Sequence, residues 1–273
     1  MTQLTQAQPD LGTRIIEAQG RRARMWRAEF LIVWAVILAG LIAFVMFTIK
    51  LNAEFMGSVI PFILGGAGIT LIISFISIAL AIVLAGLGAL GRLSRNPVAN
   101  GIASFYVSLV RGTPLLLQIL FIYLALPQAG LVLPELVCGI IALAFNYGAY
   151  MTEIFRAGIQ AVPHGQNEAA ESLGMNGRTT FIRIIAPQAF RIVTPAIGND
   201  FIAMLKDSSL VSVIGVQELL WKAQVAGRPT FQSMQTLIIA ALVYWAMTIV
   251  FSYFQGRLER RMATADRARG AVR

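Results

Sequence analysis

Residues 61–90 read PFILGGAGITLIISFISIALAIVLAGLGAL, and this whole stretch contains no charged side chain. The hydrocarbon core of a bilayer is about 30 Å thick, and a helix needs roughly 20 apolar residues to cross it. Backbone polar groups find no water in lipid, so a segment that crosses it must satisfy them internally, as a helix does. The stretch therefore predicts a membrane-spanning helix, long enough to cross with tilt or with a bent entry.

The composition of the whole chain supports a membrane protein. Of its 273 residues, 57% are hydrophobic and 13% are charged, and the mean hydropathy is +0.73. Soluble domains are usually about 45–50% apolar and about 25% charged. Such an apolar chain is not intrinsically disordered. Cys138 is the only cysteine, so a disulfide-stapled secreted scaffold is excluded as well.

Five more apolar runs follow the same pattern, and together they predict an all-α, polytopic transmembrane helical bundle of about six spans. The first run is preceded by 29 residues and is longer than the apolar stretch of a signal peptide, about 7–15 residues, so we expect it to be retained. The run at 113–126 is short and could extend by a turn at either end. The additional predicted spans are 30–49, 113–126, 133–151, 195–215 and 234–254.

The formal net charge of +9 has two possible origins, nucleic acid binding or membrane topology. Positions decide between them: 18 Lys and Arg residues fall on the side that holds both termini, and only 3 fall on the other. Positively charged segments stay in the cytoplasm. We therefore expect a multi-pass membrane protein with both termini in the cytoplasm, and no nucleic acid partner.

This topology divides the chain into four parts. Residues 1–29 and 255–273 are predicted to be basic cytoplasmic tails, which can also touch anionic lipid headgroups. Residues 30–60 hold the first transmembrane helix and an external loop, and residues 61–254 form the core. The segments 51–59, 127–134 and 217–233 are expected to face outward.

One stretch of the second span fits the dinucleotide pattern G-x-G-x-x-G, at residues 86–91. That pattern needs a preceding strand and an acidic residue about 20 positions later, whereas here the next acidic residue is Glu135. Small residues recur every fourth position on the same helix, which favours a close helix–helix contact instead. These residues are Ser77, Ala81, Ala85 and Ala89.

Enzyme chemistry is not expected from this chain. It contains no G-x-x-x-x-G-K-[ST] phosphate loop and no G-x-S-x-G nucleophile motif. With His164 as its one histidine and a single cysteine, it cannot build a His/Cys metal cluster. We therefore expect no catalytic residue, no metal and no cofactor.

About forty residues join the fourth and fifth predicted spans, whereas helix connections in bundles usually take about 2–8. Pro163 can open a short helix, and Gly174 stands where a left-handed cap would end it. Asn176 is a suitable N-cap for a second short helix through Ile185. Pro187 then restricts the backbone ahead of the fifth span. The loop is predicted to be two short cytoplasmic helices with a glycine turn between them.

The residues of this loop carry a family resemblance. Glu168-Ala169-Ala170, Gly174 and, nine residues later, the segment 184–187 (I-x-A-P) are similar to the EAA loop of membrane subunits in bacterial ATP-binding cassette (ABC) importers. The usual form ends I-x-L-P, and Ala replaces Leu here without affecting the glycine turn. The resemblance implies an ATPase-coupling loop whose residues are Gly165, Glu168, Ala169, Ala170, Gly174, Ile184 and Pro187.

Four more segments resemble the polar amino acid (histidine/glutamine-type) permease branch of these importers, and the similarity runs from about residue 65 to 254. They are RGTPLL at 111–116, EIFRAGI at 153–159, GQNEAA at 165–170 and LKDSSL at 205–210. The resemblance implies a transmembrane permease subunit of the bacterial cytoplasmic (inner) membrane that pairs with a second one, identical or merely similar. It also implies two cytoplasmic ATPase subunits that hydrolyse ATP and an external amino acid-binding protein. It does not identify the amino acid.

Two other function classes compete with this interpretation. A self-sufficient secondary carrier or channel would need its own energy coupling and no docking loop. A membrane anchor without a transport role would have no reason to keep three charges in one span.

Those three charges, Asp200, Lys206 and Asp207, lie in the predicted fifth span. A charge at mid-bilayer costs about 2.5–3.5 kcal/mol on insertion scales, so it should face protein or water. Asp200 and Asp207 are seven residues apart and hence share a helix face. Two interpretations stay open: a buried ion pair that locks helices, or a polar lining that meets a zwitterionic substrate, with the hydroxyls of Ser208 and Ser209 as donors.

Two predictions concern the cytoplasmic side of the core. Residues 94–111 carry large apolar side chains at helical spacing, which indicates either a helix lying on the inner membrane face or a buried packing helix. Glu153 and Arg156, three apart, are predicted to form an interfacial ion pair.

Overall fold

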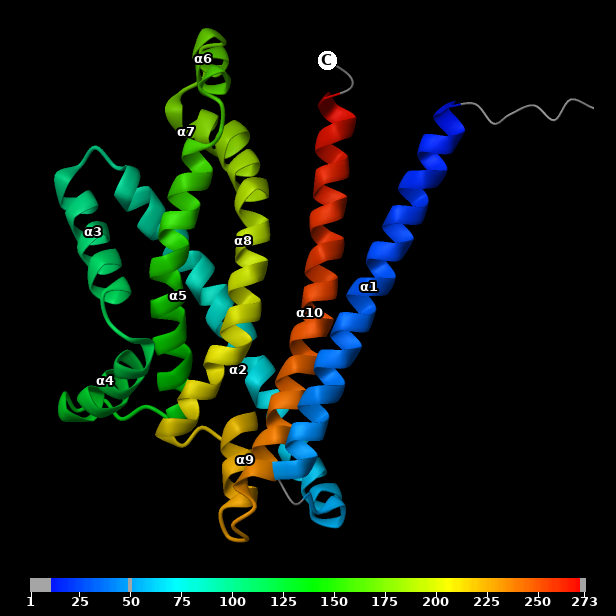
Figure 1. Cartoon of the computed structure of the whole chain (residues 1–273). Helices are drawn as coiled ribbons and strands as arrows, with labels where there is room; N and C mark the ends of the chain where they lie inside the picture. Colours follow the sequence, from blue (N-terminus) through cyan, green and yellow to red (C-terminus); the bar gives the residue numbers. More distant parts are fainter. Residues whose placement is uncertain (1–10, 49–50, 271–273) are drawn as a thin grey trace, which may run out of the picture. The chain divides into compact units, whose positions relative to one another are not determined.

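The computed structural model describes residues 11–48 and 51–270, and the chain divides into two compact units, 1–52 and 53–273. Every regular element in the described ranges is helical (Figure 1). This agrees with the predicted all-α class. The two units are described separately below.

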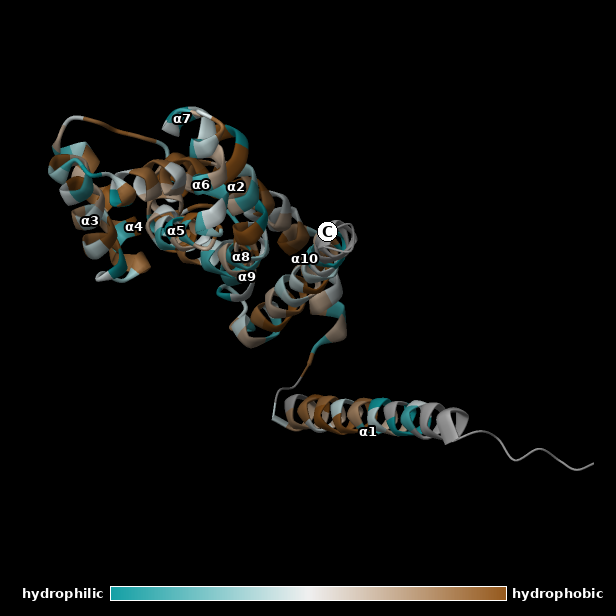
Figure 2. Cartoon of the chain, turned by 90° about the horizontal axis from the view of Figure 1, so that it is seen from above, coloured by the Kyte–Doolittle hydropathy of each residue, from teal (hydrophilic) through white to brown (hydrophobic). Residues whose placement is uncertain are grey.

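The first unit contains one helix, α1 (Leu11–Thr48). It includes the predicted span from residue 30 to 48, while residues 49–50 lie outside the described part. Its large apolar side chains are exposed, among them Trp34 and Phe47, as expected for a helix solvated by lipid. Figure 2 shows apolar residues gathered toward the later half of α1 and polar ones before them. Because α1 begins at Leu11, the predicted basic tail is helical from residue 11 to residue 29.

The second unit begins with α2 (Ala53–Leu93), a helix of 41 residues that contains the opening apolar stretch. The prediction that residues 51–59 form an external loop is wrong from Ala53 onward. The helix extends eight residues ahead of the apolar run, and Pro61 does not end it. Hydropathy locates the lipid-crossing part of a helix, but it does not locate the helix ends.

The small residues of α2 form a close contact with α5 (Glu135–Gln160), as predicted. All four of the stripe, Ser77, Ala81, Ala85 and Ala89, are completely buried. Ser77 Oγ donates a hydrogen bond to the Ile140 carbonyl at 3.3 Å. The glycine pattern at 86–91 lies inside this helix, which excludes a dinucleotide-binding turn.

The next two helices, α3 (Pro97–Arg111) and α4 (Leu115–Gln128), meet at an angle of 107°. A 14-residue helix is about 21 Å long, which is shorter than a bilayer core of about 30 Å, so α4 alone is too short for the predicted span at 113–126; the bent pair of α3 and α4 is either one broken span or a re-entrant loop. α3 packs on α2 and α5 with Val107 and Val110 buried, whereas Ile102, Phe105 and Leu109 are exposed, so both alternatives for residues 94–111 stay open.

The helix in the region of the predicted fifth span has different bounds from the apolar run. Helix α8 (Ala186–Asp207) starts nine residues before Pro195 and is followed by a 3-10 helix, η2 (Ser208–Ile214). Pro187 lies in the first turn of α8, directly after the π-helical segment η1 (Phe181–Ile185). Pro195 lies inside α8, and its carbonyl accepts a hydrogen bond from Gln255 Nε2 at 3.2 Å. Neither proline therefore marks the start of the span.

The chain ends with α9 (Leu219–Gly227) and α10 (Ser233–Gly270), and α10 contains the predicted sixth span. The segment 217–233 was expected as an external loop, but most of it is α9, which packs on α2 and α10. Glu218 is fully buried at its start and accepts hydrogen bonds from the hydroxyl of Tyr244 and from the Trp221 backbone N–H.

Four helices in the described ranges are long and apolar enough to cross a membrane, or five when the bent pair counts as one. They are α1, α2, α5 and α10, with α3 and α4 as the pair. α8 is not among them, so six spans stay a prediction. The main core lies between α2, α5 and α8 and includes Ile73, Leu143, Met151 and Met204.

Candidate functional site

The long loop protrudes from the end of the second unit that is drawn at the top of Figure 1. It contains α6 (His164–Ser172), which begins after Pro163. Gly174 has φ +72°, which confirms the predicted left-handed cap. Its N–H bonds to the Glu171 carbonyl at 2.9 Å, and the Met175 N–H bonds to the Ala170 carbonyl at 3.0 Å. These two bonds satisfy the carbonyls at the end of the helix and fix the turn.

The second helix of the loop, α7 (Gly177–Thr180), starts at the predicted cap: Asn176 Oδ1 accepts from the Thr179 N–H at 2.9 Å. The prediction that it ends as a separate helix at Ile185 is wrong. It continues through one π-helical segment, η1 (Phe181–Ile185), directly into α8. The break was expected at Pro187, but the backbone is helical on both sides of this proline, as η1 before it and α8 after it.

The surface of the loop combines charge with apolar area. Glu168 and Ala169 are exposed, Ala170 is buried, and Leu173 is 80% exposed. The side chain of Ala169 is small, so another protein can approach the backbone of α6 closely at this point. Leu173 adds an exposed apolar side chain to the same surface. Leu173 was not predicted as a functional residue, although an apolar side chain ahead of the Gly174 turn was a usable signal.

The remaining predicted coupling residues lie on both sides of the turn. Gly165 is exposed on α6 and has open space around it. Ile184 is half-buried in η1, and Pro187 is exposed at the start of α8. Gln188 Nε2 links the two sides, since it donates to the Ile184 carbonyl at 2.9 Å and to Gln166 Oε1 at 3.4 Å.

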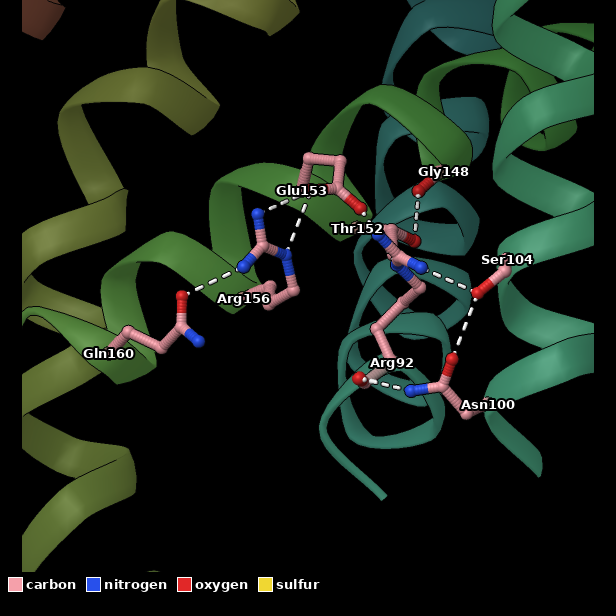
Figure 3. A network of polar contacts seen from close by, with 8 residues as sticks. All are labelled: Arg92, Asn100, Ser104, Gly148, Thr152, Glu153, Arg156 and Gln160. Atoms are coloured by element: carbon pink, nitrogen blue, oxygen red, sulfur yellow. Dashed lines mark hydrogen bonds and ion pairs between the residues drawn. The ribbon is translucent and has the colours of Figure 1, made fainter. Parts of the chain in front are cut away.

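A polar network joins three helices below this loop (Figure 3). Glu153 on α5 forms the predicted ion pair with Arg156, at 2.8 Å between Oε2 and Nη2. It also pairs with Arg92 of α2, which was not predicted. Arg92 in turn donates to Ser104 of α3, and Asn100 Nδ2 donates to the Arg92 carbonyl at 2.7 Å. The pair is therefore the centre of a cross-helix network.

A cavity of about 340 Å³ lies between the α3–α4 junction, α5 and α8. This volume is at the lower end of the usual range for small-molecule sites, about 300–1,000 Å³. Its wall is formed by Thr113, Pro114, Leu115, Asn146, Tyr147, Tyr150, Asp200, Ala203 and Asp207.

Both aspartates of α8 contribute to this wall, consistent with their common helix face. Tyr147 donates its hydroxyl to Asp207 Oδ2 at 2.8 Å. Asp200 Oδ2 is buried and has no hydrogen-bond partner within the part of the chain that the structure describes. The wall therefore holds one carboxylate with a neutral partner and one with a free oxygen.

The other predicted path residues lie elsewhere. Lys206 is exposed and does not line the cavity. Ser208 is fully buried and donates to the Leu205 carbonyl at 2.8 Å, while Ser209 is half-buried outside the wall. The structure thus brings together only the two aspartates among the five predicted residues.

The polar lining from α5 was not predicted. Asn146 and Tyr147 stand in an apolar span, and a polar residue in such a span is a signal that could have found them. Asn146 Nδ2 donates to Gln118 Oε1 at 3.1 Å, and Gln118 Nε2 donates to Thr113 Oγ1 at 2.8 Å. These bonds tie the bent α3–α4 junction to α5 and give the cavity a fixed wall. No group of three or more His, Cys, Asp or Glu in the described ranges could hold a metal ion.

Residues 77–264 match the family described as "Binding-protein-dependent transport system inner membrane component". The chain belongs to this family. It is therefore a permease component of an ABC importer of the inner membrane, and it is not itself an enzyme, since the ATPase of these transporters is a separate subunit. The matched range includes α5, the protruding loop, α8 and both aspartates of the cavity.

Curated relatives carry more specific names. The arginine transport system permease protein ArtQ of Bacillus subtilis is 36% identical over 219 residues, which are 79% of this chain and all of ArtQ. The L-cystine permease TcyB of the same organism is 39% identical over 203 residues, 74% of this chain and 87% of TcyB. A putative glutamine permease GlnP of Rickettsia typhi is 35% identical over 204 residues, 74% of this chain and 94% of GlnP.

Solved structures agree with these relatives. An amino acid ABC transporter crystallised with histidines matches with a TM-score of 0.73 and 40% identity, over 78% of this chain and all of that one. The MetNI methionine transporter matches with a TM-score of 0.64 over 78% of this chain and 99% of its own. At 15% identity, the second match shows the shared fold alone.

Proposed function

We propose that this chain carries a polar amino acid across the cytoplasmic membrane, driven by ATPase subunits that dock on the loop from Glu168 to Pro187. An external amino acid-binding protein delivers the substrate. The names of the relatives support the substrate class, and the family supports the division of labour between membrane subunit and ATPase.

The observation that carries the coupling proposal is the construction of the loop. Its protruding end offers exposed Glu168, Ala169 and Leu173, a combination suited to a groove on another protein. Its turn at Gly174 is fixed by two backbone bonds. A partner that moves this surface therefore moves a structured segment.

Movement of the loop has a direct path to the cavity. α7, η1 and α8 follow one another without an interrupting loop, and the far end of α8 carries Asp200 and Asp207. A shift or rotation of this helix changes the position of both carboxylates. We propose that ATP binding and hydrolysis in the partner act on the cavity through this helical connection.

Assembly and orientation follow the same proposal. The permease pairs with a second subunit, either another copy or a similar chain, and both its termini face the cytoplasm. The 18-to-3 distribution of Lys and Arg supports this orientation.

Reconstitution tests the function. The chain is purified with its ATPase and binding-protein partners and placed in liposomes, and uptake of labelled amino acids is measured with and without ATP. We expect uptake only when ATP, the ATPase and the binding protein are all present. Uptake without the ATPase, driven by an ion gradient or by the amino acid gradient alone, would instead establish the secondary carrier or channel.

A further inference from the structure

A groove of about 350 Å³ lies between the last turns of α2 and the first turns of α3, apart from the cavity described above. The two helices touch at its floor, because a Cβ added to Gly91 would lie 2.9 Å from the Cβ of Ala103. Leu87 and Ile102 are large, apolar and mostly exposed along it. The residues that line the groove are Leu84, Leu87, Gly88, Gly91, Ala99, Ile102, Ala103, Tyr106 and Phe145.

The lining of this groove offers no free polar side chain. Its one polar side-chain group is the hydroxyl of Tyr106, which donates to the Phe145 carbonyl at 2.7 Å. The neighbouring polar side chains of α3, Asn100 and Ser104, bond to Arg92 instead (Figure 3). A polar solute would lose its bonds to water here without replacement, whereas a hydrocarbon chain would cover apolar surface.

One end of the groove carries a positive charge. Gly91 and Ala99 line the groove, and the short connection between their helices holds Arg95. Arg95 is exposed and has no hydrogen bond or ion pair with any residue that the structure describes. The connection is ordered, since the Asn96 N–H donates to Ser94 Oγ at 3.1 Å and Asn96 Oδ1 caps α3. The guanidinium is therefore presented from a fixed turn.

This charge is not balanced by the surrounding sequence. The Arg92 guanidinium is paired with Glu153, but no Asp or Glu occurs between Glu54 and Glu135 to serve Arg95. A second copy of the chain in the same membrane orientation would bring another basic end to the same level and add repulsion. An apolar groove that ends at an unpaired cation instead matches an occupant with an apolar body and an anionic head.

We infer that this groove binds an anionic phospholipid, with one acyl chain between α2 and α3 and the phosphate at Arg95. Basic side chains beside membrane helices attract anionic lipid headgroups. The acyl chain covers the exposed apolar edges that Leu87 and Ile102 give to the groove. The inference needs only the membrane location of the chain and does not depend on amino acid transport.

Lipid titration tests the site directly. The purified full chain in a mild detergent is titrated with phosphatidylglycerol, which is anionic, and with phosphatidylcholine of the same acyl chains, which is zwitterionic. Native mass spectrometry counts the lipid molecules that stay bound. We expect phosphatidylglycerol to bind about fivefold more tightly or better, the effect of one arginine near an anionic headgroup.

Two variants separate the headgroup from the acyl chain. Arg95→Gln should abolish the preference for phosphatidylglycerol and leave phosphatidylcholine binding and the melting temperature in detergent unchanged. Arg178→Gln, the same change on an exposed arginine of α7, is the matched control and should keep the preference. Ala99→Phe fills the groove and should weaken both lipids severalfold. Should Ala99→Phe fail to fold, Ile102→Ala removes an exposed edge of the groove and should weaken both lipids as well.

Four results would overturn the inference. Equal affinity of the wild-type chain for both lipids would remove the headgroup site. An equal loss in Arg178→Gln and Arg95→Gln would show diffuse charge attraction only. Unchanged lipid binding in the groove variants would place the acyl chain elsewhere. Disulfide linkage of Ile102→Cys between two copies in native membranes would assign the groove to a second copy. None of these results affects ATP-driven amino acid uptake, so the proposed function stands or falls separately.

Discussion

Glu153 on α5 and Arg92 on α2 form an ion pair, with 3.1 Å between Oε1 and Nε, although 61 positions separate them in the sequence. The second carboxylate oxygen of Glu153 is held by Arg156. One carboxylate therefore connects two guanidinium groups and fastens the end of α2 to α5, close to the start of the protruding loop (Figure 3).

Glu153→Gln is expected to destabilise the protein by about 1 kcal/mol, because it leaves two neighbouring guanidinium groups without an anion while solvent screens part of the effect. The melting temperature of the purified chain measures this loss. In a double-mutant cycle with Arg92→Gln, the combined variant should lose less stability than the sum of the single ones. Arg95→Gln, an exposed arginine nearby, is the control; additive losses would contradict the pairing.

Gly174→Val is expected to disrupt ATPase docking while membrane insertion stays normal. At φ +72° a side chain costs roughly 1–2 kcal/mol, and a β-branched one is especially unfavourable. Co-purification of the ATPase with the tagged permease measures docking. Gly256→Val is the matched control, because Gly256 lies on α10 outside the loop and has open space and no positive φ. Normal co-purification of both variants would refute a coupling role for the turn.

Glu168→Lys reverses a charge on the exposed face of α6 and should weaken association with the ATPase, since unlike charges at an interface would become like charges. We expect reduced co-purification and a proportional loss of ATP-driven uptake, with an unchanged melting temperature of the isolated chain. Glu54→Lys, at the other end of the unit, should retain both. A variant at Glu168 that transports at the wild-type rate would remove this residue from the interface.

Gly66→Ala is expected to destabilise the contact between α2 and α9 by about 1–3 kcal/mol. A Cβ at Gly66 would lie 2.7 Å from Leu219 Cα, and the obstructing atoms belong to the backbone, which cannot rotate away. Gly68→Ala, two residues on, meets nothing within 4 Å and should be neutral or slightly stabilising. Thermal unfolding of both variants checks the difference, and equal melting temperatures would contradict the packing.

The membrane orientation can be tested by cysteine labelling of intact cells with an impermeant maleimide. Cysteines that replace Glu54 and Arg228 should react from outside. Cysteines that replace Glu168 and Arg178 should react only after the cells are permeabilised. Cys138 is 1% exposed and should give little background. Labelling of the loop positions from outside would reverse the proposed topology.

Local signals in the sequence predicted much of this protein correctly. The apolar run at 61–90 identified a membrane helix because the length needed to cross lipid is fixed by the bilayer itself. Gly174 and Asn176 located the turn and the cap of the loop because both conformations depend on the residue and its immediate neighbours. The stripe of small residues on α2 predicted a face for close helix packing, but it did not predict that α5 is the helix that packs there.

Helix ends were predicted less well. The starts of α2, α8 and α9 were missed because helical segments extend past the apolar runs, and tertiary packing stabilises turns that hydropathy does not mark. Pro187 and Pro195 were interpreted as boundaries, yet one occupies a first helical turn and the other is accommodated beside α10.

The sequence alone determined that this is an all-helical membrane protein with a structured loop ahead of α8 and charged residues in the fifth predicted span. It also placed Asp200 and Asp207 on one helix face, because helical periodicity is a local property. Only the tertiary structure decided which residues surround that helix face and that a cavity lies beside it. The rest of the cavity wall comes from the α3–α4 junction, the start of α4 and α5, which lie about 50 to 95 positions away in the chain, and the same packing leaves Lys206 exposed. Which side of a helix becomes a binding wall depends on its distant neighbours, and no local pattern encodes their positions.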